Sequence, residues 1–165
     1  MKVFFALFVL LLSATVAPSM EIKRDNLVGA WSYVSTYSEF KDGRKENIFG
    51  AKPVGMFVIL PNGHYSHIIM HPELPKVRSN RVRDMTIAEA ERIAEGTLAH
   101  FGTYTVNETA GSFTVKITKA SFPNLDGRSQ VRTILQLDDE TLSYINDVSV
   151  AEEGAKVVAV LRRVQ

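Results

Sequence analysis

The sequence contains no cysteine, so no disulfide contributes to the stability of its fold. An excess of charge of one sign is also missing, because 19 Lys+Arg are balanced by 18 Asp+Glu to leave a formal charge of +1. A field this weak does not attract nucleic acid or anionic lipid by electrostatics alone, so we expect no nucleic-acid partner. The rest of the composition, 45% hydrophobic and 22% charged, is typical of one globular domain with a real core.

The long apolar run of the chain is confined to its start. Met1-Lys2 is followed by apolar residues from Val3 to Leu12 and then by small residues up to Ser19. A membrane span needs about 20 apolar residues, so this run is too short and is instead typical of a secretory signal peptide. We expect residues 1–19 to be a signal peptide and residues 20–165 to be the mature domain. The protein is then secreted or periplasmic and has no stable membrane span.

Segments with alternating apolar and polar residues recur along the remaining chain and are separated by turn residues, which predicts antiparallel strands. The Asn62-Gly63 pair supplies the positive φ angles that a tight hairpin needs. Because an open sheet exposes its edge strands, about eight strands with one short helix favour a closed barrel. The expected strands are Ala30–Tyr37, Gly55–Leu60, His64–Met70, Phe101–Val106, Ser112–Lys119, Gln130–Leu137, Thr141–Asn146 and Lys156–Val164.

One segment interrupts this pattern. The stretch from His71 to Asp84 contains two prolines and charges of mixed sign, which predicts a long exposed loop. Thr86 and Glu89 then form the pattern of a capping box, with a helix expected as far as Ala94 or Leu98. We expect this helix to plug or flank one mouth of the barrel.

Several motifs carry a family resemblance. Gly29-Ala30-Trp31 matches the Gly-x-Trp signature of lipocalins, and further matches extend along the chain. They are Leu27–Trp31, Phe49-Gly50, Pro53–Gly55, Leu60–His64, His71-Pro72, Phe101–Tyr104, Phe122–Asn124 and Gln130–Arg132. On these residues the chain resembles the bacterial and fungal lipocalin-like domain family over about residues 27–164. The resemblance implies a mainly β fold, an antiparallel calycin-type barrel in which Trp31 closes one end beneath Arg163.

What the resemblance implies about function is less specific than what it implies about fold. Family members are small-molecule binders by inference, and more distant lipocalin-like proteins act as cofactor-free cyclases. The strand after Gly111 often carries histidines in the family, whereas here it reads Phe113-Thr114-Val115-Lys116. This departure argues against an imidazole-based activity shared across the family.

Candidate ligand contacts lie on the expected strands. Arg132 shares a strand face with Gln130 and Ile134, and a buried guanidinium there would need a ligand carboxylate, a ligand enolate or an internal acid as its partner. The alternatives for Arg132 are a structural ion pair and a surface position, and the alternative for the tyrosines is aromatic core filling. The full set is Tyr33, Tyr37, Met56, Val58, Ile68, Met70, Tyr104, Gln130, Arg132 and Tyr144.

Other chemistries find little support in the sequence. Alternation places His67 and His71 on one face and His64 on the other, so no compact set of three metal ligands forms without help from His100, and we expect no metal and no cofactor. Surface or rim positions are expected for the histidines, with proton transfer at His67 or His71 as the alternative. The chain lacks Gly-x-Ser-x-Gly and glycine-rich phosphate loops. Asn107-Glu108-Thr109 is a glycosylation sequon for a eukaryotic source.

Three functions follow from these observations. The first is an exported barrel that binds a small hydrophobic or amphipathic molecule. The second is a cofactor-free cyclase or isomerase that acts on a natural-product intermediate in the same pocket. The third is a structural or interaction module whose barrel is filled by its own side chains. A cavity above about 300 Å³ would favour the first two, because ligand sites commonly have at least that volume.

Overall fold

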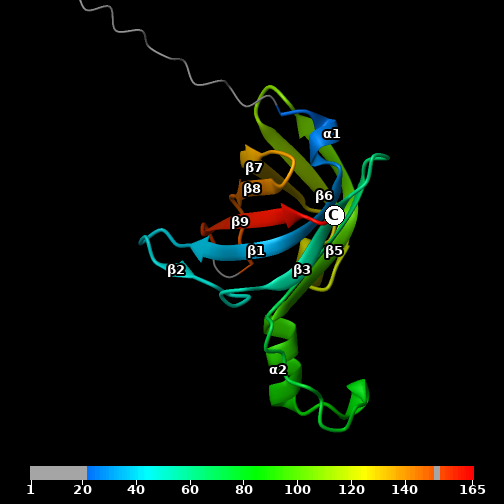
Figure 1. The fold of residues 1–165 in the computed structure, drawn as a ribbon. Helices are drawn as coiled ribbons and strands as arrows, with labels where there is room; N and C mark the ends of the chain where they lie inside the picture. The colour runs from blue at the N-terminus through cyan, green and yellow to red at the C-terminus, as the bar shows by residue number, and fades with distance from the viewer. Residues whose placement is uncertain (1–21, 151–152) are drawn as a thin grey trace, which may run out of the picture.

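The computed structural model describes residues 22–150 and 153–165, and the expected signal peptide lies outside these residues. Eight strands form a closed antiparallel barrel in which each strand pairs with its neighbour in sequence and β1 pairs with β9 (Figure 1). The predicted antiparallel barrel is therefore confirmed. Its strands are β1 (Gly29–Glu39), β3 (Val54–Ile59), β4 (His64–Met70), β5 (Thr97–Asn107), β6 (Ser112–Ala120), β7 (Ser129–Leu137), β8 (Thr141–Asn146) and β9 (Lys156–Arg163).

The remaining elements are short. Strand β2 (Lys45–Glu46) extends the sheet at the end of β1, where Ser38 pairs with Glu46. Helix α1 (Arg24–Leu27) precedes β1. Neither element was predicted, because two or four residues are too few to show a periodic pattern.

Helix α2 (Ile87–Glu95) begins as the capping box predicts. The Glu89 backbone N–H donates to Thr86 Oγ1 at 3.2 Å, and the Thr86 backbone N–H donates to Glu89 Oε2 at 2.8 Å. No residue of α2 is buried, and the helix projects away from the barrel (Figure 1). Of the two expected placements, α2 does not plug the barrel, because a helix without a buried face cannot fill an interior. It flanks the mouth instead, where Arg92, Ala94 and Glu95 line a hollow.

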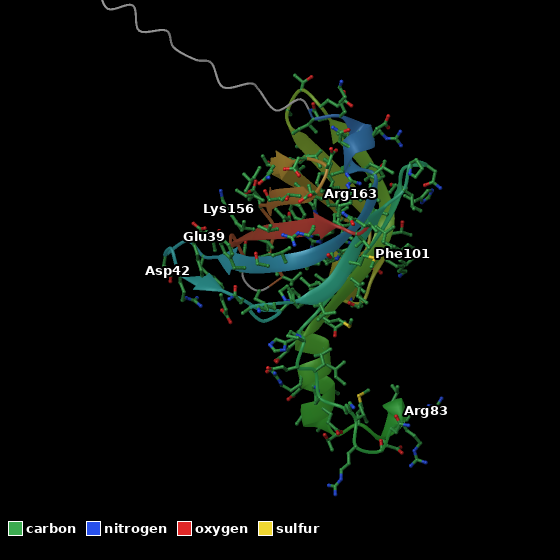
Figure 2. All side chains as sticks on the ribbon, in the orientation of Figure 1. Glu39, Asp42, Arg83, Phe101, Lys156 and Arg163 are labelled. Carbon is green, nitrogen blue, oxygen red and sulfur yellow. The ribbon has the colours of Figure 1, made fainter. Side chains whose placement is uncertain are left out.

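The loop before α2 lies on the same projection. It contains a 3-10 turn at Val82–Asp84, and Figure 2 shows Arg83 at the far end of this segment. None of the described helices is long and apolar enough to cross a membrane.

The core follows the alternation of the strands. Trp31, Phe57 and Phe113 are each fully buried inside the barrel, together with Leu142 and Leu161. Figure 2 shows Phe101, on β5, pointing away from the barrel, and this side chain is half exposed.

Two strands have apolar residues on both faces. Phe57 and Ile59 of β3 and Tyr65, His67 and Ile69 of β4 are buried, whereas their sequence neighbours are half-buried or exposed. The neighbours that point outward are Met56, Val58, Ile68 and Met70, which were expected to line the cavity. Because side chains alternate along a strand, a prediction that selects the wrong face as interior misplaces every residue of that face.

Trp31 and Arg163 lie together at the end of the barrel where β1 begins. The Arg163 Cζ lies 4.1 Å from the centroid of the Trp31 ring. The guanidinium donates to the backbone oxygens of Asp139, Val28 and Asn26 at 2.8, 2.7 and 2.6 Å. The Trp31 Nε1–H donates to Leu27 O at 2.9 Å. The contacts with Val28 and Asn26 join the segment before β1 to the end of β9, and the contact with Asp139 joins the end of β9 to the turn between β7 and β8.

The backbone and surroundings of residue 29 require a glycine at this position before Trp31. Its φ is +141°, and a Cβ on this residue would lie 2.5 Å from Arg163 Nη1. A side chain here would therefore be strained and would push the guanidinium off its carbonyl acceptors.

We expect Gly29→Ala to lower the free energy of unfolding by about 1–3 kcal/mol, through backbone strain and loss of the Arg163 contacts. Gly43→Ala is the matched control, because Gly43 also has a positive φ but a Cβ added there would meet no atom within 4 Å. Urea unfolding of both variants measures the difference. Equal losses in the two variants would contradict a specific role for Gly29 beneath Arg163.

Candidate functional site

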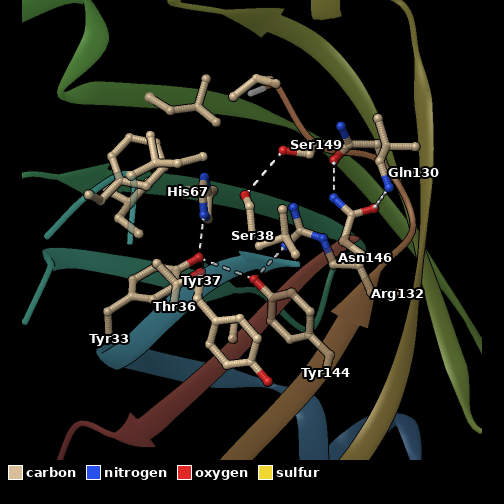
Figure 3. Close-up of a pocket in the computed structure, with 18 of the residues that line it drawn as sticks. Tyr33, Thr36, Tyr37, Ser38, His67, Gln130, Arg132, Tyr144, Asn146 and Ser149 are labelled. Atoms are coloured by element: carbon tan, nitrogen blue, oxygen red, sulfur yellow. Dashed lines mark hydrogen bonds between the residues drawn. The ribbon is translucent and has the colours of Figure 1, made fainter. Parts of the chain in front are cut away.

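A small cavity of about 60 Å³ lies in the barrel interior. Its walls come from β1, β4, β5, β7, β8 and β9 and from two loops, which contribute Ile48, Phe49 and residues 148–150. Many of the lining residues carry polar groups, and these are Tyr33, Thr36, Tyr37, Ser38, His67, His100, Gln130, Arg132, Tyr144, Asn146 and Ser149 (Figure 3). The interior is thus not filled by apolar side chains alone, as it would be in a purely structural barrel.

A chain of hydrogen bonds crosses this cavity (Figure 3). Arg132 Nη1 donates to the Tyr144 hydroxyl at 3.3 Å, and the hydroxyls of Tyr144 and Tyr33 lie 3.1 Å apart. The Tyr33 hydroxyl lies 2.5 Å from His67 Nε2. These residues come from β7, β8, β1 and β4, so the network exists only when the barrel is closed.

Arg132 is buried, with 2% of its surface exposed. No Asp or Glu is buried anywhere in residues 22–150 and 153–165, so the guanidinium has no internal acid as a partner. Its Cζ lies 4.8 Å from the Phe57 ring centroid and 5.0 Å from that of Tyr144, and these rings stabilise the cation partly. Arg132 Nε still has no hydrogen-bond partner within the described part of the chain.

Two buried histidines form the opposite wall. The rings of His67 and His100 stack with centroids 4.3 Å apart, and Tyr65 Oη lies 2.9 Å from His100 Nδ1. Burial lowers the pKa of His67 well below its usual value, and His100 and Arg132 add to the effect. Burial and Arg132 lower the pKa of His100 to about 3. Both imidazoles are therefore neutral at neutral pH, and His67 Nδ1 has no partner among the described residues.

Burial also acts on the tyrosines of the network. It raises the pKa of Tyr33 well above its usual value, and the neighbouring Tyr144 adds to this shift. The Tyr33 hydroxyl therefore keeps its proton at neutral pH and is available as a hydrogen-bond donor.

A larger hollow of about 680 Å³ lies outside the inner cavity, at the mouth next to the last turn of α2. Ile48, Phe49, Leu98 and Val150 line both spaces and so form the boundary between them. The hollow has apolar walls, including Phe40 and Phe122, and a charged rim with Arg44, Arg92, Glu46 and Glu95. Its volume lies within the usual range for ligand sites, whereas that of the inner cavity alone does not.

The structure brings together half of the residues expected to contact a ligand. Tyr33, Tyr37, Gln130, Arg132 and Tyr144 all line the inner cavity. Tyr104 does not line it, and its hydroxyl donates to Leu60 O at 2.9 Å beside the β3–β4 turn. The other four, Met56, Val58, Ile68 and Met70, face outward.

Sequence reasoning placed neither His67 nor His100 inside the barrel, although it named His67 as an alternative proton-transfer residue. His67 and His100 were expected at the surface or rim, but they are 5% and 4% exposed. They face each other because β4 pairs with β5 in a register that sets His67 against His100. A signal was present in the alternation of β4, which puts His67 on the same face as Tyr65 and Ile69. Of the other histidines, His64 is exposed and His71 lines the outer hollow.

Among the described residues there is no cluster of three or more His, Cys, Asp or Glu that could hold a metal ion. The side chains around the cavity supply neutral imidazoles, hydroxyls and a buried guanidinium.

These features define a closed antiparallel β-barrel with a polar interior site. A family model described as a lipocalin-like domain matches residues 28–164, so the chain belongs to the lipocalin-like domain family. No curated protein matches the chain. Among solved structures, the chain is similar to a redesigned β-barrel, with 15% identity and a TM-score of 0.43 over 86% of this chain and 94% of that one.

The buried histidines predict a pH dependence of stability. The folded pKa of His100 is about 3 and its usual value is 6.5, so below pH 6.5 the unfolded state binds a proton that the folded state does not. Stability is therefore retained above pH 6.5 and lost as the pH falls toward 3. We expect His100 alone to cost about 2 kcal/mol between pH 6.5 and pH 5.

The measurement is urea unfolding at a series of pH values for the native protein and for His100→Gln. Carboxylates also titrate in this range, so the difference between the two proteins isolates His100. His64→Gln, which removes an exposed imidazole from the same barrel wall, is the control and should behave like the native protein. Parallel pH profiles for the native protein and His100→Gln would contradict the prediction.

Proposed function

We propose that this protein is an exported carrier that holds one small amphipathic molecule, with a polar head in the inner cavity and an apolar body in the outer hollow. The observation that carries the proposal is that a small inner cavity and a larger outer hollow adjoin. A cavity of about 60 Å³ that contains a buried guanidinium and tyrosine hydroxyls meets an open hollow of about 680 Å³ along a shared apolar boundary. The lipocalin-like fold supports a ligand-binding barrel.

The sizes of the two spaces limit what the ligand can be. A cavity of about 60 Å³ can hold a few water molecules or one small polar group, but not a whole drug-sized molecule. The body of a larger ligand would therefore occupy the hollow and contact residues such as Phe40 and Leu98. Apolar walls with a few fixed polar groups are the usual anatomy of a small-molecule site.

Export is the part of the proposal that depends on the sequence alone. The pattern of residues 1–19 supports a signal peptide and a secreted or periplasmic protein. A fold without cysteine suits both reducing and oxidising compartments, so it does not restrict the location further.

Blocking the boundary between the two spaces tests the carrier function. Leu98 lies on β5 and lines both spaces, so we expect Leu98→Trp to weaken binding of naphthalene-1-acetate by about tenfold or more. Ile68→Trp is the control, because Ile68 lies on the adjacent strand β4 but points outward. Isothermal titration calorimetry measures both. Unchanged affinity in Leu98→Trp, or no binding to the native protein, would contradict the proposed site.

The second candidate is a cofactor-free cyclase or isomerase in the same pocket. The observation in its favour is the contact between the Tyr33 hydroxyl and His67 Nε2 beside the Arg132 guanidinium. In such a reaction Arg132 would stabilise negative charge on a substrate oxygen, and neutral His67 would accept a proton that Tyr33 helps to relay. No step of this kind needs a metal or a cofactor.

Tyr33→Phe separates the two candidates, because it removes the hydroxyl that contacts His67 but keeps the ring that fills the wall. For an enzyme we expect turnover of a bound natural substrate to fall by about 100-fold or more while its binding changes little. The assay is to incubate compounds that co-purify with the protein and to follow their conversion by mass spectrometry. For a carrier these compounds stay unchanged with both proteins.

A further inference from the structure

The inner cavity contains buried polar atoms that nothing in the described chain satisfies. Arg132 Nε and His67 Nδ1 are buried side-chain atoms without a hydrogen-bond partner, and both residues line the cavity. A buried polar group without a partner is costly, and native proteins leave few of them. Two such groups around one cavity therefore indicate a ligand that supplies the missing partners.

The unpaired atom of Arg132 is a donor, because an arginine side chain has no acceptor. The contacts between Tyr144, Tyr33 and His67 admit either direction of donation, and the tautomer of His67 follows from that direction. Arg132 Nη1–H donates to the Tyr144 hydroxyl. We assign donation from Tyr144 to Tyr33 and from Tyr33 to His67 Nε2, which places the imidazole proton on Nδ1. In this tautomer His67 Nδ1 is an N–H donor, as Arg132 Nε is.

Charge adds a second argument. The guanidinium stays charged, yet no carboxylate of residues 22–150 or 153–165 is buried with it. The aromatic rings of Phe57, Phe113 and Tyr144 stabilise the cation from its faces, but they accept no hydrogen bond from Nε. The interior thus carries one uncompensated positive charge.

A comparison within the same chain shows how unusual this environment is. Arg163 also lies against an aromatic ring, that of Trp31, but its Nε, Nη1 and Nη2 all donate to backbone oxygens. The fold therefore gives every guanidinium nitrogen of Arg163 an acceptor but leaves Nε of Arg132 without one. The contacts of Arg163 stabilise the fold, whereas Nε of Arg132 remains available to a ligand.

From these observations we propose that the inner cavity is a carboxylate site, in which Arg132 forms the ion pair with the acid group of an amphipathic ligand and His67 Nδ1 donates a second hydrogen bond. This inference rests on the proposed function and names its ligand class: an organic acid with an apolar body. A carboxylate fits the cavity of about 60 Å³, presents two oxygens to two donors and matches the fork of a guanidinium.

The first test uses acetate, which needs only the inner cavity. The Nε–H resonances of the protein labelled with ¹⁵N are followed during titration with sodium acetate, with acetamide as the neutral control of similar size and with sodium chloride as the ionic-strength control. We expect the Arg132 resonance, assigned from its absence in Arg132→Met, to shift and saturate with acetate and to respond about tenfold more weakly to acetamide. The Arg163 resonance should not move, because its Nε–H already donates to Asp139 O.

The second test uses a ligand with an apolar body. Naphthalene-1-acetate and naphthalene-1-acetamide differ in the acid group alone, and calorimetry gives their affinities for the native protein, Arg132→Met and Arg163→Met. We expect Arg132→Met to weaken binding of the acid by about tenfold or more and binding of the amide by less than about threefold. Arg163→Met should affect the two compounds equally.

Thermal unfolding distinguishes a ligand-binding role of Arg132 from a purely structural one. Removal of an uncompensated buried charge relieves its desolvation cost, so Arg132→Met should keep or raise the Tm. Arg163→Met should lower the Tm, because it leaves three carbonyl oxygens without their donor. A lower Tm in Arg132→Met, with unchanged affinity for naphthalene-1-acetate, would show that the guanidinium serves the fold and would overturn the proposal.

The two tests separate the carboxylate site from the carrier function. No Arg132 shift with acetate, or equal responses to acetate and acetamide, overturns the carboxylate site. Equal binding of the naphthalene acid and amide to the native protein also overturns it, but leaves the carrier function standing. A saturating acetate shift without binding of either naphthalene compound supports the anion site and contradicts the carrier function.

Discussion

The structure depends on the pairing of β1 with β9. This ladder runs from Trp31 opposite Arg163 to Glu39 opposite Lys156 and converts an open sheet into a closed barrel. Closure pairs the backbone groups of the strands with one another and leaves the interior to the side chains. Because the chain has no cysteine, this ladder and the buried side chains must stabilise the fold without covalent support. The contacts of Arg163 with the start of β1 secure the same junction at one end of the barrel.

A closed barrel allows an interior that would be costly in another fold. Arg132, His67 and His100 are all buried, together with three hydroxyl groups that they contact. The imidazoles avoid the cost of buried charge by staying neutral, which is why their pKa values fall. The guanidinium cannot do so, and it retains its charge in the same low-dielectric surroundings. The interior is therefore complementary to an external group of opposite charge. A buried charge without a partner lowers the stability of the fold, and binding sites generally have a cost of this kind.

The position of the site follows from the loops at one end of the barrel. Ile48 and Phe49 precede β3, Leu98 lies at the start of β5, and Val150 lies between β8 and β9, so segments far apart in sequence form one boundary. Helix α2 contributes its last turn to the outer hollow, while the rest of the helix extends away from the barrel. An opening of this kind can vary without any change in the barrel itself, since loops tolerate substitution better than paired strands do.

The sequence by itself determined the barrel, the β3–β4 hairpin, the bounds of several strands and the capping box of α2. These features are local or periodic, so a few residues are enough to predict each of them. The signals are the alternation of the strands, the Asn62-Gly63 pair and the Thr86–Glu89 pair. It also placed Gln130 and Arg132 on one strand face. Tertiary structure decided which face is interior, and it turned Met56 and Ile68 outward because both faces of β3 and β4 carry apolar residues. It alone set His67 against His100 and Tyr33 beside His67, because strand register and barrel closure join residues that the sequence keeps more than 30 positions apart.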